Sequence, residues 1–186
     1  MLACRNASTH AGEEDIVADA HARLAPRAPG LLTIVAPRHA ARGEEVARAM
    51  AARGVASVMR SRGGEIDAGA QCFIADTMGE MGLFYRLASV VFVGKSIGPA
   101  RGGQNPIEPA KLGAAVLHGP SVANFEEVYQ ALDTARGALE LADAGQLAGA
   151  LAHLFENPAE LRRMAATAEA TVGGFTGATN AILQAL

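Results

Sequence analysis

The stretch GKSIGPARGGQNPIEPAKLGAAVLHG, residues Gly94 to Gly119, decides the fold of this chain. It follows the apolar run VVFV at 90–93, which is typical of a buried strand, and it contains a second apolar run, AVL at 115–117. Between the runs lie a glycine-rich loop and a helix start at Asn105, where Pro106 suits the first helical position. Strand, glycine turn and helix start together predict a βαβ arrangement, which presents backbone N–H groups to an anion.

Glu108 stands in the first turn of this predicted helix and supports two interpretations. At its spacing from Asn105 the carboxylate could close a capping box and serve only its own helix. Alternatively, it could accept hydrogen bonds from the hydroxyl groups of a ligand. The residues themselves leave both interpretations open.

Composition narrows the class of protein. The 186 residues suffice for one compact domain, expected to span 1–186, and the scarcity of aromatics predicts an aliphatic core. A formal charge of −3 without a basic block argues against a nucleic-acid partner. Cys4 and Cys72 are expected to be free cytosolic thiols, and the five histidines lack zinc-ligand spacing. No apolar run approaches the ~18 residues of a membrane span and no signal peptide is visible, so we expect a soluble chain.

Apolar strands alternate with helical segments along the whole chain. The run at 31–35 is continuously apolar, as in strands buried on both faces of a parallel sheet. The alternation predicts an α/β fold, an open parallel sheet with helices on both faces. Expected strands are 1–7, 31–35, 55–59, 72–75, 90–93, 115–117 and 138–141; expected helices begin at 8, 42, 77 and 105 and then cover 125–136, 144–156, 158–172 and 178–186.

Ligands of such sheets bind beyond the C-terminal ends of the strands. Four predicted strand ends carry polar, basic or helix-starting residues, at 8–10, 37–39, 76–80 and 102–105. Arg38 is well placed for a phosphate, and Gly79 would let a nucleotide approach the backbone. Neither GxxxxGK[ST] nor GxGxxG is present. The pattern therefore predicts a phosphate or nucleotide site and identifies no reaction.

Each of these residues also has a purely structural interpretation. Ser8 and Thr9 could cap a helix, and Thr77 and Glu80 have the spacing of a capping box. The histidines at 10 and 39 could be hydrogen-bonded loop residues.

Four motifs occur in the order expected of one family: STHAGEE at 8–14, APRH at 36–39, DTMGEMGLFY at 76–85 and GGQNPIEP at 102–109. Together with GP at 119–120 and ANF at 123–125, they resemble the C-terminal half of 3-deoxy-D-manno-octulosonic acid (Kdo) transferase, which adds Kdo to the lipid A precursor. The likeness runs from about residue 7 to the C-terminus.

This resemblance implies a two-domain glycosyltransferase of the GT-B type, whose Rossmann-like C-terminal domain holds the donor substrate CMP-Kdo. It implies an inverting transfer in lipopolysaccharide core biosynthesis without a metal or other cofactor. By position, three groups of residues would contact the donor: Pro37 and Arg38 at the cytidine phosphate; Gly79, Glu80 and Met81 along the nucleotide; Asn105, Pro106, Ile107 and Glu108 at phosphate and ribose. Neighbouring residues of the same motifs are weaker candidates: Ser8, Thr9, His10, His39, Thr77, Gly103 and Gln104.

In the family, an N-terminal half carries the membrane anchor, the acceptor site and a catalytic glutamate. We therefore expect no catalytic residue in this chain, and contact with the lipid A precursor and with the cytoplasmic face of the inner membrane only through the full-length protein. Departures from the family pattern include Lys95, where glycine is usual, and Gln104, where histidine is usual; glutamine still hydrogen-bonds but does not titrate. The alternatives are a non-catalytic nucleotide-binding regulatory domain or a nucleotide-sugar epimerase-type domain.

Overall fold

A parallel β-sheet forms the centre of the molecule. The structure, a computed structural model, describes residues 2–9, 12–63, 66–67, 69–98 and 101–184, and the side chains of 9, 12–63, 66–67, 69–98 and 101–175. Within these residues seven strands form one sheet in the order β3-β4-β2-β1-β5-β6-β7, with every neighbouring pair parallel. The strands are β1 (Leu2–Thr9), β2 (Leu31–Pro37), β3 (Ser57–Met59), β4 (Cys72–Ile74), β5 (Val90–Val93), β6 (Ala115–His118) and β7 (Ala138–Glu140).

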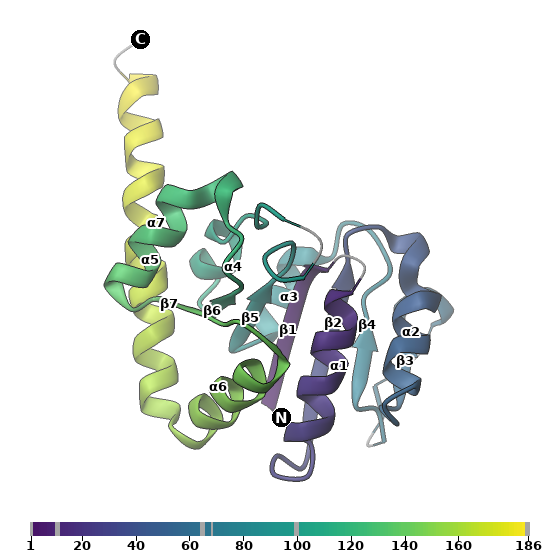
Figure 1. Cartoon of the computed structure of the whole chain (residues 1–186). Coiled ribbons are helices and arrows are strands. Elements are labelled where there is room, and N and C mark those ends of the chain that lie inside the picture. The colour runs from purple at the N-terminus through teal and green to yellow at the C-terminus, as the bar shows by residue number, and fades with distance from the viewer. Residues whose placement is uncertain (1, 10–11, 64–65, 68, 99–100, 185–186) are drawn as a thin grey trace.

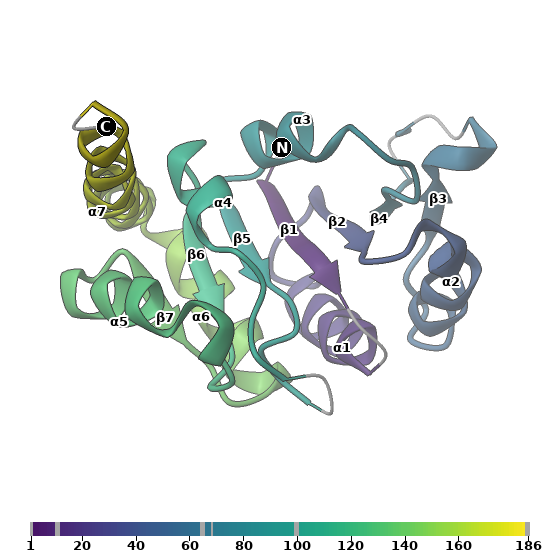
Figure 2. The same cartoon turned by 90° about the horizontal axis from the view of Figure 1, so that it is seen from above.

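Helices cover both faces of this sheet, so the predicted fold class is confirmed (Figures 1 and 2). Figure 2 shows α3 and α4 on one side of the strands and α1 and α2 on the other. The helices are α1 (Glu13–Leu24), α2 (Gly43–Ala51), α3 (Met81–Leu87), α4 (Ile107–Lys111), α5 (Glu126–Ala135), α6 (Ala144–Glu156) and α7 (Pro158–Gln184). Three short 3₁₀ turns complete the described elements: η1 (Ala40–Arg42), η2 (Arg60–Arg62) and η3 (Ala123–Phe125).

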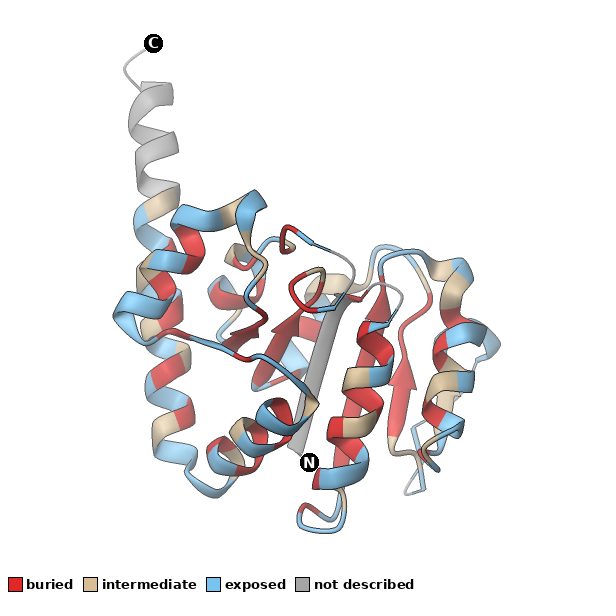
Figure 3. Cartoon of the chain, in the orientation of Figure 1, coloured by how far each residue is buried: buried red, intermediate tan, exposed pale blue. Residues whose placement is uncertain are grey.

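Alternating strand residues supply two apolar layers, one on each face. In β5, Val90 and Phe92 join the cluster beneath α1 and α6, whereas Val91 and Val93 join the cluster beneath α3, α4, α5 and α7. Figure 3 shows the buried positions on the strands and on the inward sides of the helices. This two-sided burial explains the continuous apolar runs, because a strand covered on both faces exposes neither set of side chains.

The beginning of the chain differs from the prediction. β1 continues through Ser8 to Thr9, which pairs with Pro37 of β2, so neither residue caps a helix. Instead α1 begins at Glu13 after Gly12, whose φ is 91° and which provides no side-chain cap. Pairing with β2 outweighs the local capping preference of Ser and Thr, which is a weak signal by comparison.

Two further helix predictions were wrong. α3 begins at Met81 rather than at Thr77, and Leu87 at its end is 46 % exposed. The segments predicted at 158–172 and 178–186 form the single helix α7 as far as Gln184. Neither Gly173 nor Gly174 has a positive φ, so the pair continues the helix instead of terminating it.

Two further observations concern the thiol of Cys72 and the character of the helices. Cys72 is a buried free thiol in β4, and burial raises its pKa to about 12, so it stays protonated near neutral pH. Within the described residues, none of the helices combines the length and apolar character that crossing a bilayer requires.

Candidate functional site

A cavity of about 230 Å³ lies beyond the C-terminal ends of β2 and β4. Three of the four predicted strand-end motifs contribute to its wall. The lining residues are Ala36, Pro37 and Arg38 after β2; Ala75, Thr77, Met78 and Gly79 after β4; Met81, Phe84 and Tyr85 of α3; and Gln104, Asn105 and Glu108 from the glycine-rich segment and α4. This position agrees with the rule that open parallel sheets bind ligands at the carboxyl ends of their strands.

The cavity combines an apolar floor with charged groups at its rim. Ala75, Phe84 and Tyr85 are buried, whereas Arg38 and Glu108 are exposed. Among the described residues, no hydrogen bond or ion pair is made by the Arg38 guanidinium or by the Glu108 carboxylate. The Arg38 guanidinium and the Glu108 carboxylate therefore line the cavity with hydrogen-bonding groups that are available to a polar ligand.

The two interpretations of Glu108 are now separable. The side-chain oxygen of Asn105 accepts the Ile107 N–H at 2.9 Å, but α4 begins at Ile107 and its N-cap is Pro106, so the predicted helix start at Asn105 is displaced. Glu108 makes no corresponding bond to any backbone N–H of the described residues. The capping-box interpretation of Glu108 is wrong, and a contact between its carboxylate and a ligand stays a prediction.

Glu80 lies beside the cavity and is bound to other protein groups. Its carboxylate accepts a 2.6 Å hydrogen bond from the Thr77 hydroxyl and forms a 2.9 Å ion pair with Arg60. Arg60, and after it the Thr77 hydroxyl, lower the pKa of Glu80. Thr77 and Glu80 thus bond to each other through their side chains, but α3 begins after them and neither side chain caps it. Gly79, with φ of 87°, does line the cavity.

The glycine-rich loop after β5 does bind an anion, but that anion is part of the protein. Glu13 is fully buried, and its carboxylate accepts the N–H groups of Lys95 at 2.8 Å, Ser96 at 3.1 Å and Ile97 at 3.3 Å. These three donors are consequently not available to a ligand, contrary to the expectation for this turn. No local pattern indicated this contact, because acidic residues in the first turn of a helix are already expected from the helix dipole.

The segment at 102–105 is held rigidly against the rest of the sheet. The N–H groups of Gly103 and Gln104 donate to the main-chain oxygens of Lys95 and Gly94, at 2.7 and 3.0 Å. Gly102 has a φ of 110°, and a Cβ atom there would lie 2.7 Å from the Asn124 side chain, so only glycine fits. The segment presents Gln104 and Asn105 to the cavity, whereas Gly103 is buried behind it.

The remaining predicted residues do not line the cavity. Pro106 and Ile107 belong to the start of α4, and His39 is an exposed residue before η1. Thr9 is buried at the end of β1, and its hydroxyl has no hydrogen-bond partner among the residues that the structure describes. His10 and the side chain of Ser8 lie outside the described residues. Conversely, Met78 lines the cavity but was not predicted as a site residue. Its side chain is 78 % exposed, and no apolar periodicity in the sequence indicated its position.

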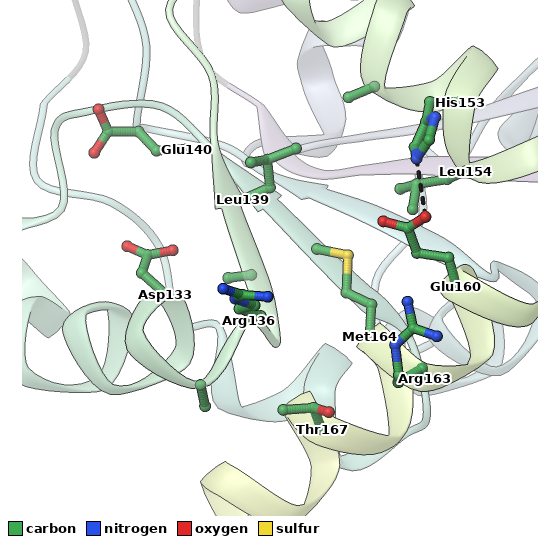
Figure 4. Close-up of a pocket in the computed structure, with 13 residues that line it drawn as sticks. Asp133, Arg136, Leu139, Glu140, His153, Leu154, Glu160, Arg163, Met164 and Thr167 are labelled. Atoms are coloured by element: carbon green, nitrogen blue, oxygen red, sulfur yellow. Dashed lines mark hydrogen bonds and ion pairs between the residues drawn. The ribbon is translucent and has the colours of Figure 1, made fainter. Parts of the chain in front are cut away.

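A second and larger cavity, of about 740 Å³, lies at the β7 edge of the sheet between α6, α7 and the end of α5 (Figure 4). It contains no residue of the four motifs. Several of its charged groups already have partners: His153 lies 3.0 Å from Glu160, and Asp133 lies 3.0 Å from His118. Size alone favours this cavity, but its position away from the motif-bearing strand ends makes the smaller one the candidate site.

Comparison with known proteins shows which family the chain resembles. The 3-deoxy-D-manno-octulosonic acid transferase of Bordetella pertussis is 36 % identical over 184 residues, which are 97 % of this chain and 43 % of that protein. The Haemophilus influenzae protein of the same name is 34 % identical over 135 residues, 73 % of this chain and 31 % of that protein. The chain thus spans less than half the length of these relatives. No protein-family model matches the sequence.

Solved structures give the corresponding result for the fold. The C-terminal CMP-Kdo binding domain of WaaA from Acinetobacter baumannii matches with a TM-score of 0.87 and 32 % identity, over 92 % of this chain and 89 % of that one. WaaG, a glycosyltransferase involved in lipopolysaccharide biosynthesis, matches with a TM-score of 0.67 and 14 % identity, over 93 % of this chain and 43 % of that one. The second match concerns the fold alone. Because a solved domain is matched over nearly its whole length at 32 % identity, this chain belongs to the Kdo transferase family and corresponds to the C-terminal domain of that enzyme.

Proposed function

We propose that this chain binds CMP-Kdo and is the donor-binding part of a glycosyltransferase that moves Kdo to the lipid A precursor in lipopolysaccharide core biosynthesis. The observation that carries the proposal is the cavity in which Arg38 and Glu108, both without protein partners among the described residues, face an apolar floor. A nucleotide offers the complementary groups: a phosphate, ribose hydroxyls and a flat apolar base. Binding sites for ligands of this size are typically lined by apolar side chains with a few fixed polar groups.

Five of the residues that line the cavity have a role in this proposal. Arg38 binds the phosphate of CMP, since a guanidinium donates two parallel hydrogen bonds to an oxyanion. Glu108 accepts hydrogen bonds from the ribose hydroxyls. Gly79 allows the backbone to approach the nucleotide closely, because it lacks a side chain. Phe84 and Tyr85 form the apolar surface beneath the base.

The reaction we propose is an inverting transfer. A hydroxyl of the acceptor attacks the anomeric carbon of Kdo, the bond from that carbon to the phosphate oxygen of CMP breaks, and the acceptor proton passes to a general base. Arg38 stabilises the negative charge on the departing phosphate. CMP-Kdo is a substrate here, and the proposal invokes no cofactor.

The general base and the acceptor site belong, in our proposal, to the further polypeptide that a full-length transferase carries at the cytoplasmic face of the inner membrane. A base must lie within hydrogen-bond reach of the hydroxyl that it deprotonates. The one unpartnered carboxylate in the described cavity, Glu108, is assigned to ribose. This chain alone should therefore bind donor without transferring Kdo to lipid A precursor.

Calorimetric titration with CMP, UMP, AMP and GMP tests the donor assignment. We expect CMP to bind in preference to the other three. Equal and weak binding of all four would reduce the cavity to a general phosphate site and overturn the assignment. Release of CMP from CMP-Kdo together with transfer to lipid A precursor by this chain alone would overturn the proposed division of labour.

A further inference from the structure

The buried carboxylate of Glu13 controls a loop that the proposed donor site depends on. We propose that Glu13 is a positioning residue: it fixes the loop at 95–97, and through this loop it fixes Gln104 and Asn105 in the wall of the nucleotide site. The inference rests on the proposed function for its effect on CMP. Its effect on the geometry of the protein stands independently of any ligand.

The first link runs from α1 to the loop after β5. Lys95 has a φ of 60°, and from this left-handed residue onward three successive N–H groups converge on one carboxylate. Converging backbone N–H groups of this kind form an anion-binding hollow, often called a nest. Here Glu13 supplies the anion, with Oε2 facing Lys95 and Oε1 facing Ser96 and Ile97.

The second link runs from the loop to the site. The main-chain oxygen of Lys95 accepts the Gly103 N–H at 2.7 Å, and that of Gly94 accepts the Gln104 N–H at 3.0 Å. Lys95 thus donates to Glu13 through its nitrogen and accepts from Gly103 through its oxygen. Gln104 and Asn105, which follow directly, line the cavity.

The opposite side of the loop is fixed by the end of β5 and by the residue after β6, which makes the effect of Glu13 local. The Ser96 hydroxyl donates to the main-chain oxygen of Val93 at 2.6 Å and accepts the Gly119 N–H at 2.8 Å. Gly119 approaches so closely that a Cβ atom there would overlap the main-chain oxygen of Ser96. With this side secured, loss of the Glu13 carboxylate should shift the loop and its neighbours without unfolding the domain.

The next residue provides a matched control. Glu14 is nearly as buried as Glu13, at 3 % against 0 % exposure, and it lies in the same first turn of α1. Its carboxylate, however, forms a 2.8 Å ion pair with Arg42, and within the described part of the chain it makes no hydrogen bond to the loop at 95–97. A buried carboxylate can therefore be neutralised one residue away with no direct effect on the site.

The experiment compares Glu13→Gln with Glu14→Gln. Glutamine at 13 keeps the size of the side chain and one oxygen acceptor, but its NH₂ group faces a backbone N–H. For both variants we would measure the dissociation constant for CMP by calorimetry, the amide ¹H–¹⁵N chemical shifts of 103–105 and the thermal midpoint. We expect Glu13→Gln to raise the dissociation constant about tenfold and to move the amide signals, on the scale of known couplings through packed networks. Glu14→Gln should lower the thermal midpoint but change neither the dissociation constant for CMP nor the amide signals of 103–105.

The outcomes separate this inference from the proposed function. Wild-type affinity and wild-type amide shifts at 103–105 in Glu13→Gln would overturn the positioning role and leave Glu13 with a role in stability alone. If the unaltered chain does not bind CMP, the proposed function fails, and the amide shifts of the two variants still decide the positioning role. Should Glu13→Gln not fold, Glu13→Asp, which keeps the charge but withdraws it from the loop, is measured in the same way.

Discussion

The hydroxyl of Tyr129 donates a 2.8 Å hydrogen bond to the main-chain oxygen of Gln104 and so joins α5 to the wall of the candidate site. Tyr129 is fully buried, and its ring lies 4.5 Å from that of His118 at the end of β6. Burial raises the pKa of Tyr129 far above its usual value, so the hydroxyl remains a donor at every physiological pH.

Replacing Tyr129 by Phe should destabilise the protein by about 1–2 kcal/mol, because the Gln104 oxygen then loses its buried donor. The side chain otherwise keeps its shape, so the apolar contacts persist. Urea unfolding measures the change, and the denaturant slope should stay constant. A variant as stable as the original would show that water replaces the hydroxyl in this contact.

Replacing Glu108 by Gln should weaken CMP binding by about 1.5–3 kcal/mol, the scale of a hydrogen bond to a charged group. Stability should change by less than about 0.5 kcal/mol, as for a surface substitution away from structural contacts. Calorimetry and urea unfolding measure the two quantities.

Glu140→Gln is the control for this experiment, because Glu140 is an exposed carboxylate in the larger cavity at the β7 edge. Its replacement should leave CMP affinity unchanged. If Glu140→Gln weakens CMP and Glu108→Gln does not, the nucleotide binds in the larger cavity instead.

Replacing Lys95 by Gly should stabilise the protein. A left-handed conformation costs a non-glycine residue roughly 1–2 kcal/mol, and the greater freedom of glycine in the unfolded chain offsets about 0.5–1 kcal/mol of the gain. The contact with Glu13 uses the backbone N–H of Lys95 and survives the change. Arg136, with φ of 64°, allows the same test at the end of α5. Lower thermal midpoints for both glycine variants would contradict the argument.

His21 should make stability depend on pH. Its Nδ1 lies 2.8 Å from the Thr33 hydroxyl, its Nε2 is buried with no hydrogen-bond partner in the described ranges, and burial lowers its pKa from 6.5. As pH falls below about 6.5, the unfolded chain takes up a proton that the folded protein resists, so the free energy of unfolding decreases until the lowered pKa of the folded state is passed.

Urea unfolding over a pH series from about 7.5 to about 5 measures this slope. His21→Gln should remove the part of the slope that His21 contributes, because glutamine does not titrate. Identical slopes for the original protein and for His21→Gln would assign the pH dependence to other groups.

The fold could be predicted from the sequence because its signal is repeated. Continuous apolar runs such as 31–35 and 90–93 alternate with helices, and this alternation specifies a parallel sheet however the individual ends are placed. The ends themselves were less predictable. Thr9 could cap a helix or extend a strand, and its partner in β2, Pro37, decided the outcome from 28 residues away.

The site was predictable as a location and less so in its contacts. The motif residues Arg38, Gly79 and Glu108 do meet at one cavity, since strand ends of a parallel sheet share one edge. Local spacing, however, could not reveal that Arg60 would bind Glu80, or that Glu13 would bind a loop more than 80 residues further along the chain. Such pairs form only when the sheet brings distant segments together. The ligand roles of Arg38, Gly79 and Glu108 stay predictions.

The close approach of Gly119 to Ser96 has a consequence for genetic screens of this protein. The two closest obstructing atoms belong to the backbone of Ser96, so a second mutation that shortens the neighbouring Ile97 side chain still leaves no room for a Cβ at 119. A saturation library selected for CMP binding should therefore be depleted at position 119 as strongly as at Arg38, although Gly119 does not line the cavity. Measuring the amount of folded protein as well as the bound CMP for each variant distinguishes a residue that binds the ligand from a position that admits no side chain.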